Sequence, residues 1–182
     1  MRRVLVIGSG GAGKSTFAVA LGRRAGLPVI HLDALYWRPG WVEAPPDEWR
    51  ATVARAIAGE AWVMDGNYGG TLAERLAAAD TAIFLDLPRT LCLARVVLRW
   101  LRHAGRTRPD MAPGCPEQLT WEFVRWIWSY PRDRRPDVLR RLAALPPSTQ
   151  AIVLRSPREV SDFLAAVRVR PDRPRTSGES PA

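Results

Sequence analysis

Residues 8–15 read GSGGAGKS, and no other stretch constrains this chain as much. Residues 2–7, RRVLVI, precede the glycines and have the pattern of a short buried strand, and residues 14–26 have the pattern of a helix. Glycines between a strand and a helix turn backbone N–H groups toward one anion, and the helix dipole adds to the attraction. The spacing therefore predicts a phosphate-binding loop, the P-loop. The residues expected to contact a nucleotide there are Gly8, Gly10, Gly11, Ala12, Gly13, Lys14, Ser15 and Thr16.

Lys14 is the only lysine in a chain with 27 lysines and arginines together. A lysine ammonium is a compact charge on a flexible stem, whereas a planar guanidinium is wider and fits a phosphate cradle badly. This contrast predicts that Lys14 reaches the β- and γ-phosphates of a nucleotide and is catalytic. The hydroxyl of Ser15 would then serve Mg²⁺. The alternative is a glycine-rich turn that binds no ligand.

Strand-like and helix-like segments alternate along the chain. After the first pair, strands are expected at residues 28–33, 61–65, 81–87 and 150–155, and helices at residues 46–59, 71–79, 89–103 and 157–167. This alternation predicts an α/β fold in which helices cover both faces of a parallel sheet.

The segment at residues 103–149 interrupts the alternation. Residues 103–118 are rich in proline and glycine and carry arginines, so they predict a mobile loop. Residues 119–130 predict an unusually aromatic helix, which Pro131 and Pro136 are expected to end.

Length and composition indicate an ordinary globular enzyme. A chain of 182 residues is expected to form one domain over residues 1–169, followed by a disordered tail at residues 170–182. The net charge of +9 suggests nucleic-acid binding, but arginines spread along the whole chain favour a compositional bias instead. No apolar run reaches 18 residues, and the two cysteines form no metal or disulfide pattern. A cytoplasmic protein without membrane contacts, a monomer or homodimer, is expected.

Aspartates stand at the ends of two expected strands. Asp33 and Asp65 would lie at the edge where open α/β sheets bind ligands. There Asp33 could accept the proton of an acceptor hydroxyl or orient it, and Asp65 could hold Mg²⁺ together with Ser15. The alternative for Asp33 is a capping aspartate. The residues expected to contact the acceptor are Asp33, Tyr36, Trp37, Arg38, Asp65, Gly66, Asn67 and Tyr68, of which the aromatic ones could instead belong to the core.

Arginines gather on the expected helix at residues 89–103 and in the loop after it. Arginines that close over a nucleotide stabilise charge on the transferring phosphoryl group and exclude water, whereas the alternative is a solvated basic surface. The candidate arginines in these two segments are Arg95, Arg99, Arg102, Arg106 and Arg108. Arg95 is expected to contact the nucleotide, and Arg99, Arg102 and Arg106 are expected to be catalytic. The turn with Arg155 and Pro157 is expected to contact the adenine.

Four segments together resemble the adenylate-kinase-like P-loop kinases. They are GSGGAGKST, HLDALYW, WVMDGNY and DTAIFLDLPRTLCLARVVLR, and the resemblance covers roughly residues 3–165. Within that group the chain is most similar to the small bacterial DNA topology modulation (FlaR-like) proteins. The resemblance implies a five-stranded parallel sheet of order 2-3-1-4-5, an acceptor-binding segment after the second strand and a helical arginine lid after the fourth.

Two positions bear on the acceptor that this resemblance implies. Nucleoside monophosphate kinases of this lineage carry an Asp-Gly-x-x-Arg motif, whose arginine holds the acceptor phosphate, but Gly69 stands at that position here. Arg75 or Arg38 could replace the missing arginine. Conversely, Asp33 is similar in position to the carboxylate that shikimate-kinase-like and chloramphenicol-phosphotransferase-like enzymes use on an acceptor hydroxyl. A hydroxyl acceptor is therefore favoured.

The expected function is an ATP- and Mg²⁺-dependent phosphotransferase that moves the γ-phosphate of ATP to a hydroxyl of a small molecule. The acceptor would be a nucleoside, a sugar or an antibiotic that carries either, and an antibiotic acceptor would imply a role in resistance. One alternative is a nucleoside monophosphate kinase with a displaced arginine. The other is an ATP-binding regulatory or nucleic-acid-binding protein whose basic lid contacts phosphate backbones.

Overall fold

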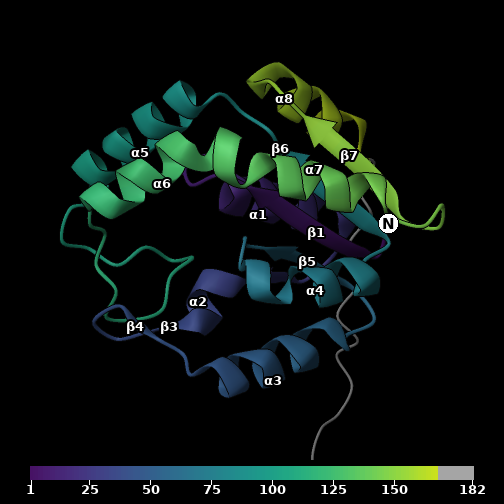
Figure 1. The fold of residues 1–182 in the computed structure, drawn as a ribbon, viewed down its shortest axis with the longest axis horizontal. Coiled ribbons are helices and arrows are strands. Elements are labelled where there is room, and N and C mark those ends of the chain that lie inside the picture. Colours follow the sequence, from purple (N-terminus) through teal and green to yellow (C-terminus); the bar gives the residue numbers. More distant parts are fainter. Residues whose placement is uncertain (168–182) are drawn as a thin grey trace, which may run out of the picture.

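The computed structural model describes residues 1–167, in which helices surround a central sheet (Figure 1). Five strands form that sheet, and two short strands pair separately as an antiparallel hairpin. The sheet strands are β1 (Arg3–Gly8), β2 (Val29–His31), β5 (Trp62–Asp65), β6 (Thr81–Leu85) and β7 (Gln150–Leu154), and the hairpin strands are β3 (Trp37–Arg38) and β4 (Val42–Glu43). The helices are α1 (Lys14–Ala25), α2 (Leu32–Tyr36), α3 (Pro46–Ile57), α4 (Leu72–Ala78), α5 (Arg89–His103), α6 (Trp121–Asp133), α7 (Arg135–Ala143) and α8 (Pro157–Ala166), with a short 3₁₀ turn at Gly69–Thr71.

The order of the central sheet is β2-β5-β1-β6-β7, and every neighbouring pair is parallel. The numbers in this order differ from those of the expected order 2-3-1-4-5. The reason is that an unpredicted hairpin, β3–β4, lies between β2 and β5 in the chain and is counted in the labels. Counted among the sheet strands alone, the order is 2-3-1-4-5. The predicted α/β class with a parallel sheet is therefore confirmed.

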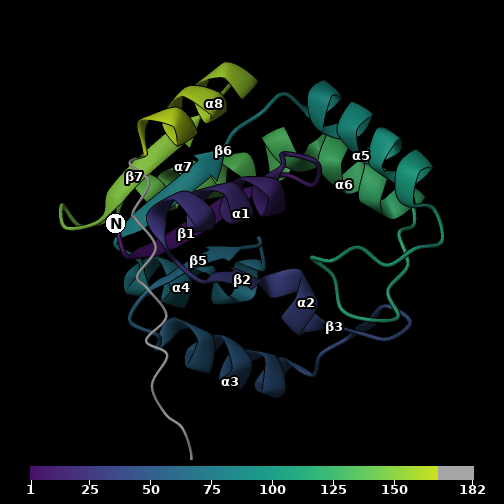
Figure 2. The ribbon, with the colours of Figure 1, turned by 180° about the vertical axis from the view of Figure 1, so that it is seen from behind.

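Alternation of side chains along β1 builds a core on each face of the sheet. Leu5 and Ile7 belong to a buried cluster with residues of α3, α4 and α7, whereas Val4 and Val6 belong to one with α1, α5 and α8. Figure 2 shows α1 and α8 together on one side of the sheet, and Figure 1 shows α7 on the other. The sequences of β1 and β6 are almost wholly apolar because both faces of these strands are buried.

The strand register brings the carboxyl ends of the central strands to one edge of the sheet. Gly8 pairs with Leu85, and Asp65 lies opposite both Val6 and His31. The loops that follow β1, β2, β5 and β6 consequently start side by side. This edge is where a parallel sheet places a binding site.

Two expected element boundaries are wrong. The strand expected at residues 28–33 ends at His31, because Leu32 begins α2 and is fully buried in the core. Asp33 therefore lies in the first turn of a helix and not on a strand. Pro131 does not end the aromatic helix, because α6 continues through it to Asp133, and Pro136 lies in the first turn of α7. Burial of Ile127 and Tyr130 keeps this helix on the core despite the hydrogen bond that Pro131 cannot donate.

The tail expected at residues 170–182 lies outside the described residues, as do residues 168 and 169, so the domain boundary stays a prediction. Within residues 1–167, none of the helices combines the length and the apolar character needed to span a membrane.

Close packing of α1 against β2 depends on Gly22. A Cβ atom at this position would lie 2.5 Å from Val29 Cγ2 and 2.9 Å from the carbonyl oxygen of Leu27. We expect Gly22→Ala to lower the free energy of unfolding by about 1–3 kcal/mol, because overpacking forces backbone to move. Denaturant unfolding measures the change. Gly59→Ala is the matched control, because its Cβ would meet nothing nearer than 3.5 Å. Equal stability of the two variants would contradict the packing argument.

Candidate functional site

The P-loop connects β1 to α1 with a backbone that requires glycine at two positions. Gly11 and Gly13 have φ angles of +75° and +90°, a region that side chains disfavour. A Cβ atom on Gly11 would also come within 2.2 Å of the carbonyl oxygen of Cys92 in α5. The loop is therefore folded tightly against the start of α5, and glycine alone allows that approach.

The N-terminus of α1 is open to an anion. Gly13 caps the helix without a side-chain hydrogen bond, and the first turn contains no acidic residue. The backbone N–H groups of this turn and the helix dipole are therefore available to a negatively charged group. This is the geometry that the sequence predicts for phosphate binding.

Lys14 lies in the first turn of α1, beside the loop. Its Nζ donates a hydrogen bond to the carbonyl oxygen of Ser9 at 3.1 Å. Burial lowers the pKa of the Lys14 ammonium, and the negative charges of Asp33 and Asp65 oppose that effect. The lysine therefore contacts the P-loop and is close enough to Asp33 and Asp65 for their charges to act on it.

A cleft of about 1450 Å³ runs past this loop and is the candidate active site. It contains most of the residues predicted from the sequence. Those lining it are Gly10, Gly11, Ala12, Gly13, Lys14, Ser15, Thr16, Asp33, Tyr36, Trp37, Asn67, Tyr68, Arg95, Arg99 and Pro157. Predicted residues that do not line it are Gly8, Arg38, Asp65, Gly66, Arg102, Arg106 and Arg155.

Asp33 reaches the cleft from the first turn of α2. The hydroxyl of Tyr68 donates a hydrogen bond to Asp33 Oδ1 at 2.6 Å. The neighbouring residue Asn67 accepts a hydrogen bond on Oδ1 from the backbone N–H of Gly8, at 3.1 Å. The turn after β5 consequently contacts both the start of the P-loop and Asp33, the candidate base.

Aromatic side chains form one wall of the cleft near Asp33. Tyr36 packs against Trp37, with ring centroids 5.0 Å apart, and against Tyr68 at 4.6 Å. Trp37 in turn packs against Trp41 at 5.3 Å, and both tryptophans rest on a small cluster around Met111. These rings are only partly buried, so they serve as a wall and not only as core.

Asp65 is buried beneath the cleft. His31 Nδ1 lies 2.6 Å from Asp65 Oδ1, and this hydrogen bond raises the pKa of the His31 imidazole. The two residues stand opposite each other in the register of β2 and β5. Asp65 therefore already has a partner, and its predicted role in holding Mg²⁺ stays a prediction. No cluster of three or more metal-ligating side chains occurs in the part of the chain that the structure describes.

Arginines cover the P-loop side of the cleft. Arg95 Nη1 donates to the carbonyl oxygen of Ala12 at 3.3 Å. Arg99 and Arg108 both pair with Glu117, with nitrogen–oxygen distances of 2.8 and 2.7 Å. The side chain of Glu117 is only 2% exposed, so one buried carboxylate pairs with two arginines. Sequence reasoning missed Glu117, although it is one of only two acids in the arginine-rich loop at residues 103–118.

Other predicted arginines lie elsewhere. Arg102 and Arg106 are exposed on α5 and the loop after it, and Arg155 is exposed and lies 4.0 Å from Asp86. Arg38 pairs with Glu48 at the surface. These roles were expected from helical spacing and from position in the chain, neither of which shows where a long side chain points.

Arg75 is fully buried, although sequence reasoning considered it for an acceptor phosphate. Its guanidinium donates hydrogen bonds to the carbonyl oxygens of Gly66, Asn67 and Tyr68 at 3.0, 2.6 and 2.7 Å. Burial lowers the pKa of Arg75 to about 10. Its donors are used within the protein, so it stabilises the turn after β5.

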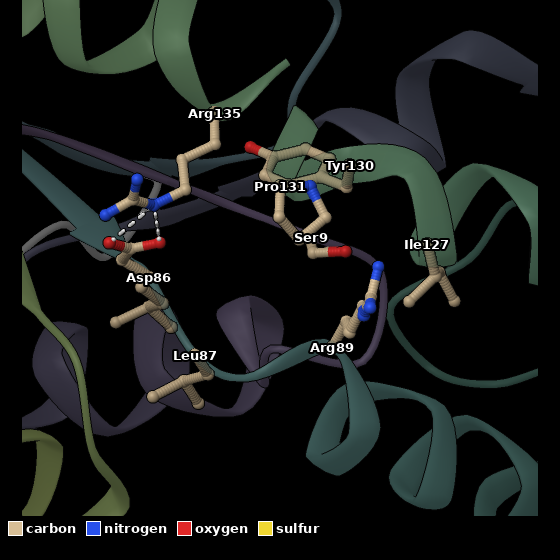
Figure 3. Close-up of a pocket in the computed structure, with 9 residues that line it drawn as sticks. Ser9, Asp86, Leu87, Arg89, Ile127, Tyr130, Pro131 and Arg135 are labelled. Carbon is tan, nitrogen blue, oxygen red and sulfur yellow. Dashed lines mark hydrogen bonds and ion pairs between the residues drawn. The ribbon is translucent and has the colours of Figure 1, made fainter. Parts of the chain in front are cut away.

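Asp86, at the end of β6, binds an arginine of α7. Arg135 Nε lies 2.8 and 3.0 Å from its two carboxylate oxygens (Figure 3). The pair borders a small cavity of about 10 Å³, which reaches the P-loop residue Ser9. Ser9 Oγ is buried there with no protein partner among residues 1–167. A volume of this size holds about one water molecule, so this cavity is too small for a second substrate.

Comparisons with known proteins agree with this fold. No protein-family model matches the sequence, and no curated protein matches it. The structure is similar to a shikimate kinase from Acinetobacter baumannii in complex with shikimate, with 16% identity, 91% of this chain and 89% of that chain covered, and a TM-score of 0.56. It is also similar to a putative kinase from Chloroflexus aurantiacus, with 14% identity, coverage of 91% and 96%, and a TM-score of 0.54. A gluconokinase from Sinorhizobium meliloti gives 18% identity, coverage of 90% and 91%, and a TM-score of 0.50. The chain therefore has the fold of P-loop small-molecule kinases.

Glu117 should be the electrostatic centre of the arginine lid. We expect Glu117→Gln to lower the free energy of unfolding by about 3 kcal/mol, because it leaves Arg99 and Arg108 without their shared counter-charge. Thermal unfolding measures stability, and hydrogen exchange over residues 104–120 locates the change.

Glu48→Gln is the matched control for that substitution. The side chain of Glu48 is 55% exposed in its pair with Arg38, so its loss should cost less than about 1 kcal/mol. If both variants were equally stable, the buried pairing would contribute nothing.

Proposed function

We propose that this protein is an ATP- and Mg²⁺-dependent phosphotransferase that transfers the γ-phosphate of ATP to a hydroxyl of a small molecule. One observation carries the proposal: a single cleft contains an open P-loop with Lys14 and, beside it, the carboxylate of Asp33. The P-loop with Lys14 suits the phosphates of a nucleoside triphosphate, and the carboxylate of Asp33 suits an acceptor hydroxyl.

The donor side fits a nucleotide. The P-loop presents uncapped N–H groups, and a side chain on Gly11 would collide with Cys92 of α5, so the loop is held in this conformation by close packing. Arg95 and Arg99 line the same part of the cleft and would neutralise charge on the transferring phosphoryl group. Ser15 and Asp65 are the residues proposed to hold Mg²⁺, directly or through water, and the ion would neutralise phosphate charge.

The acceptor side fits a hydroxyl compound. Asp33 Oδ1 accepts from Tyr68, and within residues 1–167 no hydrogen bond occupies Oδ2, which could accept the proton of an acceptor hydroxyl. As that hydroxyl oxygen attacks the γ-phosphorus, the bond from phosphorus to the bridging oxygen breaks and ADP leaves. The aromatic wall formed by Tyr36, Trp37 and Trp41 suits the face of a ring in a nucleoside, a sugar or an antibiotic that carries either.

The same contacts weigh against a phosphate acceptor. Arg75 is buried on backbone carbonyls, and neither Arg75 nor Arg38 lines the cleft, so neither of the two proposed replacements lies where a second phosphate would bind. A nucleoside monophosphate kinase is thus the weaker alternative. The names of two similar structures, a shikimate kinase and a gluconokinase, agree with a small-molecule acceptor. The resemblance to DNA topology modulation proteins and the cytoplasmic location stay predictions.

Lys14 is expected to be indispensable for transfer. We expect Lys14→Ala to fold normally and to lower turnover by about 10²–10³-fold, because charge stabilisation at the phosphoryl group is lost. We expect Lys14→Arg to be similarly impaired, because a guanidinium does not fit the P-loop. Steady-state kinetics measure both variants, and circular dichroism checks their fold. Wild-type turnover in Lys14→Ala would refute the assignment of this cleft as the active site.

The acceptor class can be tested directly with γ-labelled ATP. We expect label on one or more unphosphorylated nucleosides, sugars or hydroxylated antibiotics, and we expect Asp33→Asn to lower the rate of labelling about 10²–10⁴-fold, because an amide cannot take up the hydroxyl proton. Nucleoside monophosphates run in parallel. Label on monophosphates alone, with little change in Asp33→Asn, would instead identify a nucleotide kinase.

A further inference from the structure

The turn Gly66–Tyr68 follows β5 and touches both halves of the candidate active site. On one side, Asn67 accepts a hydrogen bond from the backbone N–H of Gly8, where the P-loop begins. On the other side, Tyr68 donates to Asp33 at 2.6 Å. A movement of this turn would therefore change the position of Asp33 relative to the P-loop.

A buried cation holds the turn in place. Arg75 reaches it from α4 and binds three consecutive carbonyl oxygens, those of Gly66, Asn67 and Tyr68. Burying a guanidinium without a carboxylate partner is costly unless its N–H donors are satisfied. Arg75 meets this condition, because its Nε also donates to the carbonyl oxygen and the hydroxyl of Thr71. Because three consecutive carbonyl oxygens must all face Arg75, these hydrogen bonds fix the conformation of the turn.

The backbone of the turn needs such support. Tyr68 has a φ angle of +26°, one of two positive values among the non-glycine residues that the structure describes. Gly66 has a φ of +141°, and a Cβ there would lie 2.7 Å from Leu32 Cβ. A non-glycine residue in this region is strained and persists only where the surroundings over-determine it. In this backbone conformation the ring of Tyr68 lies against Asp33 and Tyr36 of α2.

The ring of Tyr68 is itself fixed by packing. It lies 4.6 Å from the ring of Tyr36 and 4.8 Å from that of Trp49. Burial raises the pKa of the Tyr68 phenol, so its hydroxyl stays protonated and can only donate to the carboxylate. The hydrogen bond therefore occupies Asp33 Oδ1 and turns Oδ2 away from Tyr68.

We propose that Tyr68 is a positioning residue: its hydroxyl holds Asp33 so that the free carboxylate oxygen meets the acceptor hydroxyl, on a turn that Arg75 locks to the P-loop. The inference rests on the proposed transfer to a hydroxyl. In this role Tyr68 affects the rate of transfer, and it does so through the position of Asp33. Tyr68 was expected from the sequence only as a wall of the acceptor site, a role that would alter acceptor affinity instead.

A double-mutant cycle between Tyr68→Phe and Asp33→Ala tests this role. Phenylalanine keeps the ring and its packing and removes the hydroxyl alone. We expect Tyr68→Phe to lower kcat about tenfold, as loss of a hydrogen bond to a charged group does, with KM for ATP unchanged. In the Asp33→Ala background the same substitution should lower kcat no further, because the group that it positions is gone.

A second cycle in urea unfolding measures the contact without using turnover. Coupling of about tenfold in the unfolding equilibrium constant is expected between the same two substitutions. Tyr36→Phe is the matched control, because it removes a hydroxyl from the adjoining ring that interacts with Glu43 and not with Asp33. Its effects, of whatever size, should combine additively with those of Asp33→Ala.

Three results would overturn the inference. Additive effects of Tyr68→Phe and Asp33→Ala on kcat would show that the tyrosine acts independently of the aspartate. A rise in acceptor KM with unchanged kcat would make Tyr68 a binding residue only. Absence of coupling in unfolding would remove the contact itself. If the wild type transferred phosphate to no hydroxyl compound while that coupling was present, the proposed function would fail and the contact would have no catalytic role.

Discussion

Parallel pairing of β1 with β5 and β6 is the constraint on which the rest of the structure depends. Because parallel strands end at the same edge, Gly8, Asp65 and Leu85 are brought together although they are far apart in the chain. The P-loop leaves from that edge, and so does the turn Gly66–Tyr68. The active-site candidates are thus neighbours as a result of strand register, before any side chain makes a contact.

Charges near the cleft are satisfied by three different means. Lys14 and Arg95 donate to backbone carbonyls of the P-loop, Arg99 and Arg108 share the carboxylate of Glu117, and Arg75 binds the turn after β5. The first two arrangements leave cations beside an open helix N-terminus, where a polyphosphate would be attracted. The third keeps its cation away from any ligand. Arginines that look alike in the sequence therefore line the cleft in one place and support a turn in another.

Local rules predicted most of the elements correctly. The apolar run before the glycines, the helix after them and the alternation that follows are short-range patterns, and each corresponds to an element of the structure. The prediction failed where long-range packing decided the outcome. Burial of Leu32 ended β2 early and placed Asp33 on a helix, and burial of Ile127 and Tyr130 carried α6 through Pro131.

The sequence by itself determined the glycine loop between β1 and α1 and the α/β class, because these depend on backbone freedom and periodicity within a few residues. Only the tertiary structure decided the partners of long side chains. Arg75 turned inward to the carbonyls of Gly66–Tyr68, and Glu117 gathered Arg99 and Arg108. The physical reason is that a guanidinium or carboxylate on a flexible stem goes where burial and hydrogen bonding compensate its desolvation, and that place is set by segments distant in the chain.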